Sequence, residues 1–175
     1  MDGVCGGPNR GFLRPDASLD VVVVTDEDDQ STDPVATYTA FLAGMKGTGG
    51  DALVRLHAMA GDLPDGCNNT WHFGAAGTRY AQAVKATGGL FTSICTGNFD
   101  TAFAAIGSLP YVPRTLFPLS GKPWQDSLKV TVDGVVCTGG WTSQAATPAI
   151  VFDTTGACLP APGSEVVVTY FEACP

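Results

Sequence analysis

The spacing of apolar residues changes once along this chain, close to Leu109, and that change limits the folds open to it. Before Leu109, strand-like segments rich in β-branched residues alternate with segments whose apolar side chains recur every three or four residues. After Leu109 the helical spacing is lost, and an extended chain is interrupted by Pro110, Pro113, Pro118 and Pro123. Because helices do not tolerate such prolines, the sequence predicts an α/β domain over residues 1–109 and a β-rich module over residues 110–175.

The first domain is predicted to contain strands and helices in alternation. The four valines at 21–24 are typical of a strand buried on both faces of a parallel sheet. Two further strands are expected at 52–59 and 90–94, and helices at 35–45, 78–86 and 99–106. The first helix is predicted to begin with Asp33 as its N-cap. Alternating strands and helices require crossover connections, so we expect a parallel sheet with flanking helices.

The second part has the pattern of a small antiparallel module. Residues 128–132 alternate apolar and polar side chains, and Asp133-Gly134 forms a turn signal before Val135 and Val136. This combination predicts a β-hairpin. Further strands are expected at 149–152 and 165–171. A module of this size has a small core, so we expect cysteines and packing on the first domain to supplement it.

The charge of the chain excludes one large class of function. Nine basic residues against seventeen acidic ones give a net charge of -8, and the basic residues form no cluster. A nucleic-acid-binding protein needs clustered Lys and Arg to displace counterions from phosphates, so we expect no nucleic-acid partner. The longest apolar runs are far shorter than the roughly 20 residues that cross a bilayer, so no transmembrane segment is predicted.

Six cysteines are spread widely, without any Cys-x-x-Cys pair: Cys5, Cys67, Cys95, Cys137, Cys158 and Cys174. This spacing disfavours structural zinc, and the even number favours disulfides formed in an oxidising compartment, with six buried thiols as the alternative. We therefore expect an extracytoplasmic protein, although Met1 to Gly7 lacks the basic start and apolar stretch of a signal peptide.

Strand positions suggest how these cysteines pair. Cys67 and Cys95 follow the second and third predicted strands, and the ends of parallel strands meet at one edge of a sheet, so we expect them to pair. Cys137 and Cys158 both lie in the β-rich module and could link its loops. Cys5 and Cys174 then remain near the two termini. Six cysteines allow fifteen connectivities, so the other pairings stay open.

Four consecutive carboxylates, Asp26 to Asp29, directly follow the valine strand. Ligands bind at the carboxyl ends of strands in parallel α/β sheets, and Mg²⁺ and Ca²⁺ prefer oxygen ligands. Asp26, Asp28 and Asp29 are therefore candidate ligands of one of these cations. A solvated acidic turn that favours the dipole of the following helix explains the same residues equally well.

These residues also carry a resemblance to a known family. Strand 21–24 with Thr25-Asp26-Glu27 is similar to the fourth-strand segment of a von Willebrand factor type A domain. Thr87-Gly88-Gly89-Leu90-Phe91, followed by residues 98–106, resembles that family's last strand and helix. The segment 11–17 before the acidic run resembles bacterial cell-surface members, including those of myxobacteria, which often carry an additional C-terminal β module.

The resemblance implies a partial Rossmann-like fold with an incomplete metal site. In the family, a metal-ion-dependent adhesion site uses an Asp-x-Ser-x-Ser loop, a Thr and an Asp after the fourth strand. Only the last of these corresponds to a residue here, Asp26. The family's fourth strand also pairs with its first, for which this chain has no counterpart. The resemblance therefore implies that strand 21–24 has an open edge, which would be covered by the missing part of a longer gene product, by another chain, or by residues 1–18 or the β module.

Taken together, these features predict a non-enzymatic secreted or cell-surface protein that binds a protein or surface ligand. Two alternatives remain: a metal-assisted hydrolase that uses the acidic loop Asp26–Asp29, and a purely structural module. The hydrolase needs a histidine or further carboxylates near that loop. His57 lies within a strand pattern, which is typical of a packed residue, and His72 lies in a loop near Cys67. No Gly-x-Ser-x-Gly or phosphate-binding loop is present.

Overall fold

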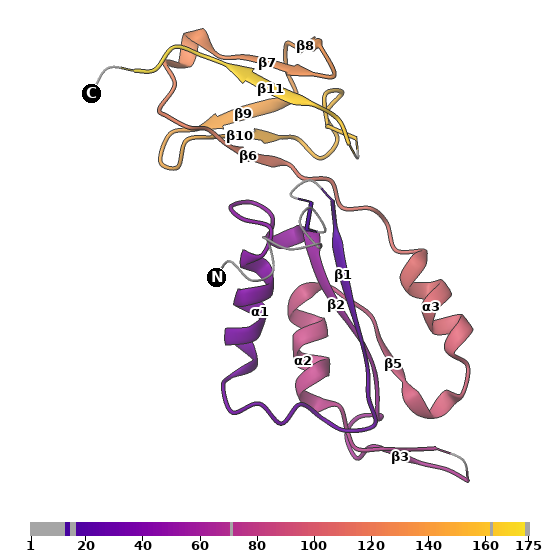
Figure 1. Cartoon of the computed structure of the whole chain (residues 1–175). Helices are drawn as coiled ribbons and strands as arrows, with labels where there is room; N and C mark the ends of the chain where they lie inside the picture. The colour runs from indigo at the N-terminus through magenta and orange to yellow at the C-terminus, as the bar shows by residue number, and fades with distance from the viewer. Residues whose placement is uncertain (1–12, 15–16, 71, 162, 174–175) are drawn as a thin grey trace. The chain divides into compact units, whose positions relative to one another are not determined.

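The computed structural model describes residues 13–14, 17–70, 72–161 and 163–173 (Figure 1). The chain forms two compact units, which we describe separately. The α/β unit contains residues 18–45 and 54–111. The β unit contains residues 46–53 together with the chain from Val112 onward. The predicted domains, 1–109 and 110–175, remain a prediction. No helix among the described residues is long and apolar enough to span a bilayer.

A parallel sheet forms the centre of the α/β unit, as the alternating sequence pattern predicted. Its strands lie in the order β1 (Leu19–Val24), β2 (Val54–Ala60) and β5 (Phe91–Ser93). The register pairs Val21 with Leu56 and Ala58 with Phe91. Two short strands, β3 (Cys67–Asn68) and β4 (Phe73–Gly74), form a hairpin beyond β2.

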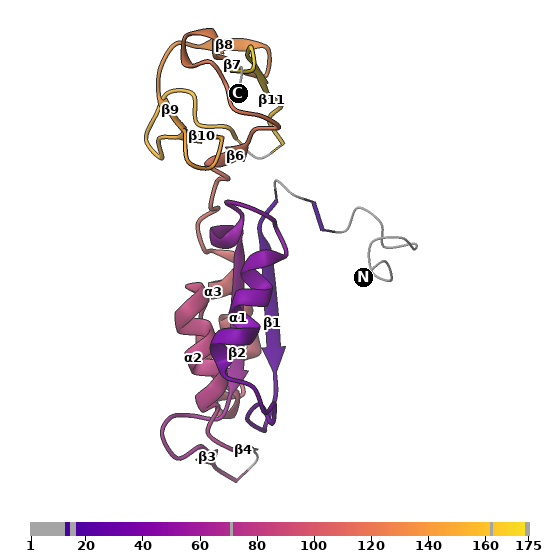
Figure 2. The same ribbon diagram turned by 90° about the vertical axis from the view of Figure 1, so that its left-hand side faces the viewer.

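Helices cover both faces of this sheet. α1 (Val35–Gly44) and α2 (Thr78–Thr87) lie on one face, and α3 (Phe99–Gly107) lies on the other (Figures 1 and 2). On the first face Leu56, Ala58, Ala83 and Val84 form the buried core. The partly buried side chains that pack against them are Val23, Val35, Leu42, Tyr80 and Phe91.

One prediction about the valine run is wrong. β1 is not buried on both faces, because it lies at the edge of the sheet and its residues alternate between half-buried and exposed. Val22 is 38% exposed and Val24 is 51% exposed. The central strand is β2, in which every residue is buried, including Arg55 and His57. Among the described residues, β1 pairs with β2 alone.

The start of the first helix also differs from the prediction. Pro34, not Asp33, occupies the N-cap of α1, and this end has no hydrogen bond from a capping side chain. The segment between α1 and β2 is irregular apart from a short 3₁₀ turn, η1 (Asp51–Leu53). It belongs to the β unit, where the Arg114 guanidinium donates to the Thr48 carbonyl over 3.0 Å.

Two small antiparallel sheets make up the rest of the β unit. One contains β6 (Leu116–Pro118), β10 (Ala149–Phe152) and β9 (Trp141–Gln144), in that order. The other contains β11 (Val166–Thr169), β7 (Lys129–Val132) and β8 (Val135–Cys137). A 3₁₀ turn, η3 (Gln125–Ser127), precedes β7. The predicted hairpin joins β7 to β8, and both turn residues, Asp133 and Gly134, have positive φ, as a type I′ turn requires.

The core of the β unit joins apolar side chains to a disulfide. Val130, Cys137, Ile150 and Phe152 are its buried residues. Cys137 is bonded to Cys158, which packs against the same cluster. The ring of Phe117 packs edge-on against Phe152, with 5.5 Å between the ring centroids. The sequence left this pairing open among several, and the structure forms it in the core of the module.

Candidate functional site

The loops that follow β1, β2 and β5 gather at one end of the parallel sheet, at the lower end of the α/β unit in Figure 1. Direct backbone contacts join them. The Ala75 amide donates to the Asp26 carbonyl over 2.7 Å, and the Gly77 amide donates to the Gly61 carbonyl over 3.0 Å. This is the end at which parallel α/β sheets bind their ligands. We therefore take the described residues of these loops, 25–33, 61–70, 72–77 and 94–98, as the candidate site.

A disulfide between Cys67 and Cys95 fastens two of these loops together, as predicted from the ends of the two strands. Hydrogen bonds of Asn69 restrain the same loops. Its side-chain amide donates to the Cys95 carbonyl over 3.1 Å, and its side-chain oxygen accepts from the His72 amide over 2.9 Å. The β3–β4 hairpin is thus held on two sides. Because Cys67 is oxidised, it cannot serve with His72 as a thiolate metal ligand.

Asp28 and Asp29 bind the first turn of α2. Both carboxylate oxygens of Asp28 accept from the Arg79 backbone N–H, over 3.0 and 3.2 Å. The Arg79 side chain donates through Nε to Asp29 over 2.9 Å and through a terminal nitrogen to the Asp33 carbonyl over 2.7 Å. Gly77, at the N-cap of α2, has no side chain that could cap the helix. Asp28 therefore supplies the cap from the neighbouring loop, where a negative charge also favours the helix dipole.

The electrostatics of the acidic loop agree with this arrangement. Hydrogen bonds from Ser31, and then from Arg79, hold the pKa of Asp29 below its ordinary value of 3.8. Partial burial raises the pKa of Tyr80 in the same first turn of α2, and the charges of Asp29 and Asp28 raise it further. The acidic turn was predicted to favour the helix directly after it, α1. It serves α2 instead, because the loop lies across the N-terminus of that helix.

Asp26, the residue with a counterpart in the resembled metal site, is exposed on the same loop. Its backbone carbonyl is engaged by Ala75, while its carboxylate has no hydrogen bond or ion pair within the described part of the chain. Across that part, no group of three or more His, Cys, Asp or Glu side chains is placed to hold a metal ion. A cation on Asp26, Asp28 and Asp29 stays a prediction. Cys5 and Cys174, the last disulfide candidates, lie outside the described residues.

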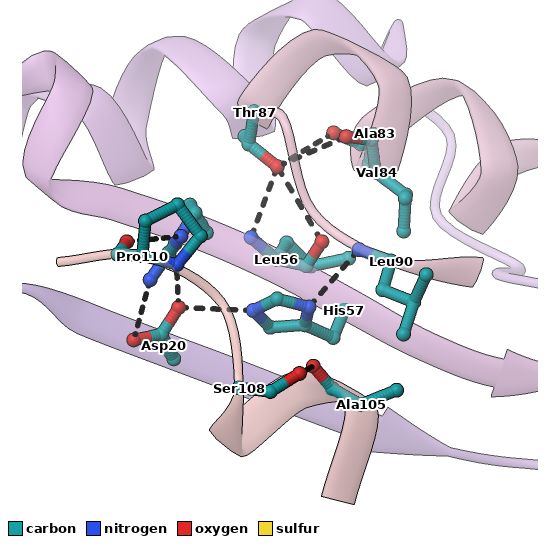
Figure 3. A network of polar contacts seen from close by, with 11 residues as sticks. Asp20, Leu56, His57, Ala83, Val84, Thr87, Leu90, Ala105, Ser108 and Pro110 are labelled. Atoms are coloured by element: carbon teal, nitrogen blue, oxygen red, sulfur yellow. Dashed lines mark hydrogen bonds and ion pairs between the residues drawn. The ribbon is translucent and has the colours of Figure 1, made fainter. Parts of the chain in front are cut away.

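A second polar cluster lies inside the α/β unit, on the face of the sheet covered by α3 (Figure 3). His57 is fully buried, and its Nε2 lies 2.9 Å from a carboxylate oxygen of Asp20. The Leu90 backbone N–H donates to Nδ1 of the same ring over 3.0 Å, so the ring proton is on Nε2 and is donated to Asp20. Arg55 donates to Asp20 over 2.8 Å and to the Pro110 carbonyl over 3.2 Å.

This cluster holds the strands in register and has no free group for chemistry. Burial alone would raise the pKa of Asp20, but hydrogen bonds from His57 and Arg55 outweigh burial and lower it from its ordinary value of 3.8. Both ring nitrogens of His57 are occupied by these bonds. The sequence pattern identified His57 as a packed residue and missed its partners Asp20 and Arg55, whose pairing across two strands depends on the register.

The Thr-Gly-Gly motif has a structural role beside this cluster. The Thr87 hydroxyl accepts from the Leu56 backbone N–H over 2.9 Å and donates to the Ala83 carbonyl over 3.0 Å (Figure 3). Gly88 has positive φ at the end of α2, and a Cβ on Gly89 would collide with the Leu56 carbonyl. The motif therefore lets the chain turn tightly against β2, which brings Leu90 to the His57 ring.

Comparison of the chain with protein-family models, with curated proteins and with solved structures finds no match in any of the three.

Proposed function

We propose that this protein is a non-enzymatic binding protein, secreted or on a cell surface, that contacts a protein ligand through the loops at the carboxyl ends of its parallel strands. The observation that carries the proposal is the β3–β4 hairpin. Phe73 on this hairpin and Leu63 on the loop before it are both exposed large apolar side chains. They are held on a loop that a disulfide and Asn69 restrain.

Restraint of this kind favours binding. Exposed apolar side chains on a mobile loop lose conformational freedom when a partner covers them, and that loss weakens association. On a restrained hairpin the loss of conformational freedom is small. Burial of Phe73 and Leu63 then contributes more of its free energy to affinity. A purely structural module gains no comparable benefit from a rigid loop with exposed apolar side chains.

Location and family membership belong to the same proposal. Two disulfides favour synthesis into an oxidising compartment outside the cytoplasm. The parallel order β1, β2, β5, with β1 at an edge, agrees with the order expected for the last three strands of a von Willebrand A-like sheet. In that arrangement a strand of the same domain pairs with the second edge of β1, which has no partner strand among the described residues.

The hydrolase alternative is less well supported by the contacts of the acidic loop. Asp28 and Asp29 are occupied by Arg79 and Ser31, so a nucleophilic water or a cation would have to displace interactions that hold α2. His57 is buried and fully bonded on another part of the sheet. Among the named candidates, Asp26 alone has a carboxylate that is exposed and makes no such contact.

Binding of the labelled chain to intact cells tests the proposal. The cells are those of the organism that makes the protein, before and after protease treatment of their surface. We expect saturable binding that protease abolishes, and about tenfold weaker binding for Phe73→Ser. Phe41→Ser is the matched control, because Phe41 is an equally exposed phenylalanine on α1, outside the site.

Two results would contradict the proposal. One is saturable binding that Phe73→Ser and Leu63→Ser leave unchanged, or the absence of saturable binding. The other is turnover of a nitrophenyl ester or phosphodiester in the presence of Mg²⁺ that Asp26→Asn abolishes, which favours the hydrolase. Calorimetric titration with Mg²⁺ and Ca²⁺, compared between the chain and Asp26→Asn, tests the cation prediction separately.

A further inference from the structure

Two residues with exposed aromatic side chains lie opposite one another across a backbone bridge in the β unit, whereas the candidate site belongs to the α/β unit. An antiparallel bridge pairs Pro123 with Glu172, which places Trp124 opposite Phe171 on one face of the bridge. The Trp124 backbone N–H donates to the Phe171 carbonyl over 2.8 Å. Trp124 is 61% exposed and Phe171 is 78% exposed. We call Trp124 and Phe171 the aromatic pair.

The backbone beneath the aromatic pair is held firmly by Ser127. The Ser127 hydroxyl donates to the Trp124 carbonyl over 2.6 Å and accepts from the Phe171 backbone N–H over 2.9 Å. The Ser127 backbone N–H also donates to the Trp124 carbonyl over 3.0 Å. Ser127 therefore holds the backbones of Trp124 and Phe171 together without a ligand. The side chains of both residues face solvent.

Exposed polar residues of both charges flank the aromatic pair in the adjoining segments. Exposure alternates along β11 and continues to Phe171, so Thr169 lies on the same outward face, where it pairs with Lys129 of β7. Asp126 is exposed on the turn that contains Ser127. The side chains of Asp126, Lys129 and Thr169 make no hydrogen bond or ion pair with another described residue. Lys122, two positions before Trp124 and opposite Ala173, is exposed on the same face. One carboxylate and two ammonium groups leave this face with a single net positive charge.

These features favour a small uncharged partner over a protein or a polyion. Aromatic side chains of this size bury about 150–250 Å² each, so the exposed part of the pair amounts to roughly 300 Å², well below the about 800 Å² per partner of a standard protein interface. One net positive charge is far fewer than the clustered basic residues that bind a polyanion, and it does not attract a polycation. A ligand that combines flat C–H surfaces with many hydroxyl groups fits both properties.

We propose that the aromatic pair is a binding platform for a neutral polysaccharide. The C–H hydrogens of a pyranose ring carry partial positive charge and stack on the negative face of an aromatic ring. The two adjacent aromatic side chains stack against two neighbouring parts of one sugar chain. Asp126 accepts hydrogen bonds from sugar hydroxyls, and Lys129, Thr169 and the Trp124 indole N–H donate to them. This site is separate from the proposed protein-binding loops and does not depend on them.

Electrophoresis of the full chain through gels that contain a dissolved polysaccharide tests this inference. The neutral probes are hydroxyethyl cellulose, mixed-linkage β-glucan, xyloglucan, galactomannan and dextran, and the charged probe is alginate. We expect at least one neutral polysaccharide to retard the chain, with affinity reduced about tenfold or more by Trp124→Ala and by Phe171→Ala. Phe41→Ala and Val135→Ala, at equally exposed apolar positions elsewhere, are expected to leave the retardation unchanged.

Several outcomes would overturn the inference. They are retardation by none of the five neutral probes, retardation by alginate alone, and retardation that both platform variants retain. Sedimentation of the chain without sugar provides a further criterion, because concentration-dependent self-association that Phe171→Ala abolishes would assign the pair to a contact between copies of the chain. Trp124 and Phe171 are largely exposed, so replacing them should not unfold the chain. An unchanged midpoint of thermal unfolding for Phe171→Ala shows that a loss of retardation reflects lost binding.

Discussion

The two units of this protein are stabilised by different interactions. In the α/β unit, polar contacts join the elements: Asp20 links β1 to Arg55 and His57 of β2, and the acidic loop caps α2. The disulfide of this unit joins two loops beyond the sheet. In the β unit, the disulfide itself lies against the apolar core around Phe152. Acid should therefore weaken the first unit, and loss of the core disulfide should weaken the second.

Separate signals can follow the two units in one sample. The three α-helices of the described residues belong to the α/β unit, so circular dichroism at the helical minimum reports on its unfolding. Trp124 and Trp141 belong to the β unit, where the Trp141 indole N–H donates to the Cys137 carbonyl over 3.0 Å. Trp71 falls within the residue range of the α/β unit, so fluorescence measured in a Trp71→Phe background reports on the β unit. The following predictions use these two signals.

The largest effect is expected from Cys137→Ala/Cys158→Ala. The bond closes a loop with a sequence separation of 21, for which chain entropy gives about 3 kcal/mol, and the lost sulfurs leave a cavity worth about 1 kcal/mol more. We expect urea denaturation followed by fluorescence to show a loss of about 4 kcal/mol in the β unit, while the helical signal is unchanged. An equal loss in both signals would mean that the units do not unfold independently.

Removal of the other disulfide, in Cys67→Ser/Cys95→Ser, is expected to cost less. Its sequence separation is 28, so chain entropy again gives about 3 kcal/mol, but the bond lies outside the core and its loss leaves no cavity. We expect at most that loss in the helical signal, together with rapid proteolysis within residues 61–77 and weaker binding to cells. A protease-resistant hairpin in this variant would show that Asn69 alone holds the loop.

Asp20→Ala tests the buried polar cluster. It leaves Nε2–H of the buried His57 without its acceptor and removes the carboxylate from Arg55. Breaking a fully buried pair costs about 3–5 kcal/mol, but Asp20 retains 30% side-chain exposure, so we expect about 2 kcal/mol from the helical signal. Asp65→Ala, at an exposed carboxylate in the same unit, is the control and should have no measurable effect.

Asp28→Ala tests the cap that the acidic loop supplies to α2. The Arg79 backbone N–H loses its acceptor, for which we expect a destabilisation of about 1 kcal/mol in the helical signal. Asp26→Ala is a matched control on the same loop, and it should leave stability unchanged. If Asp26→Ala destabilises the unit as much, the carboxylates act through their general charge and not through the cap.

The smallest effect is expected from pH. The pKa values of Asp20 and Asp29 are lowered on folding, so their contribution is complete above the ordinary value of 3.8 and is lost as the pH falls through their folded values. We expect the urea midpoint of the helical signal to fall below about pH 4, and to fall less steeply in Asp20→Asn. A fluorescence midpoint that falls in parallel would remove the proposed difference between the units.

Much of the fold could be predicted from local patterns. The alternation of strands and helices, the turn at Asp133-Gly134 and the pairing of Cys67 with Cys95 follow from spacing along the chain, since each depends on neighbouring residues or on strand ends. The order of the strands could not be predicted in the same way. The valine run was predicted to be buried on both faces, yet the fully buried central strand is β2, with Arg55 and His57.

The candidate site was predictable only in part. The position of the acidic run after a strand placed Asp26, Asp28 and Asp29 at the correct end of the sheet. Their interactions were not predictable, because Arg79 lies about fifty positions away along the chain and reaches the loop only through the packing of α2. The aromatic pair was missed for a related reason. Trp124 and Phe171 become neighbours only through the bridge between Pro123 and Glu172.

The sequence by itself determined which segments form strands, helices and turns, and that the two halves of the chain differ, because periodicity and turn residues act over a few positions. Tertiary structure alone decided which strand lies at the centre, which helix the carboxylates cap and which aromatic residues meet. Each of those outcomes is a contact between residues distant in sequence. A buried charge such as Arg55 is tolerated wherever the fold brings it a partner, and hydrophobicity along the chain does not reveal that partner.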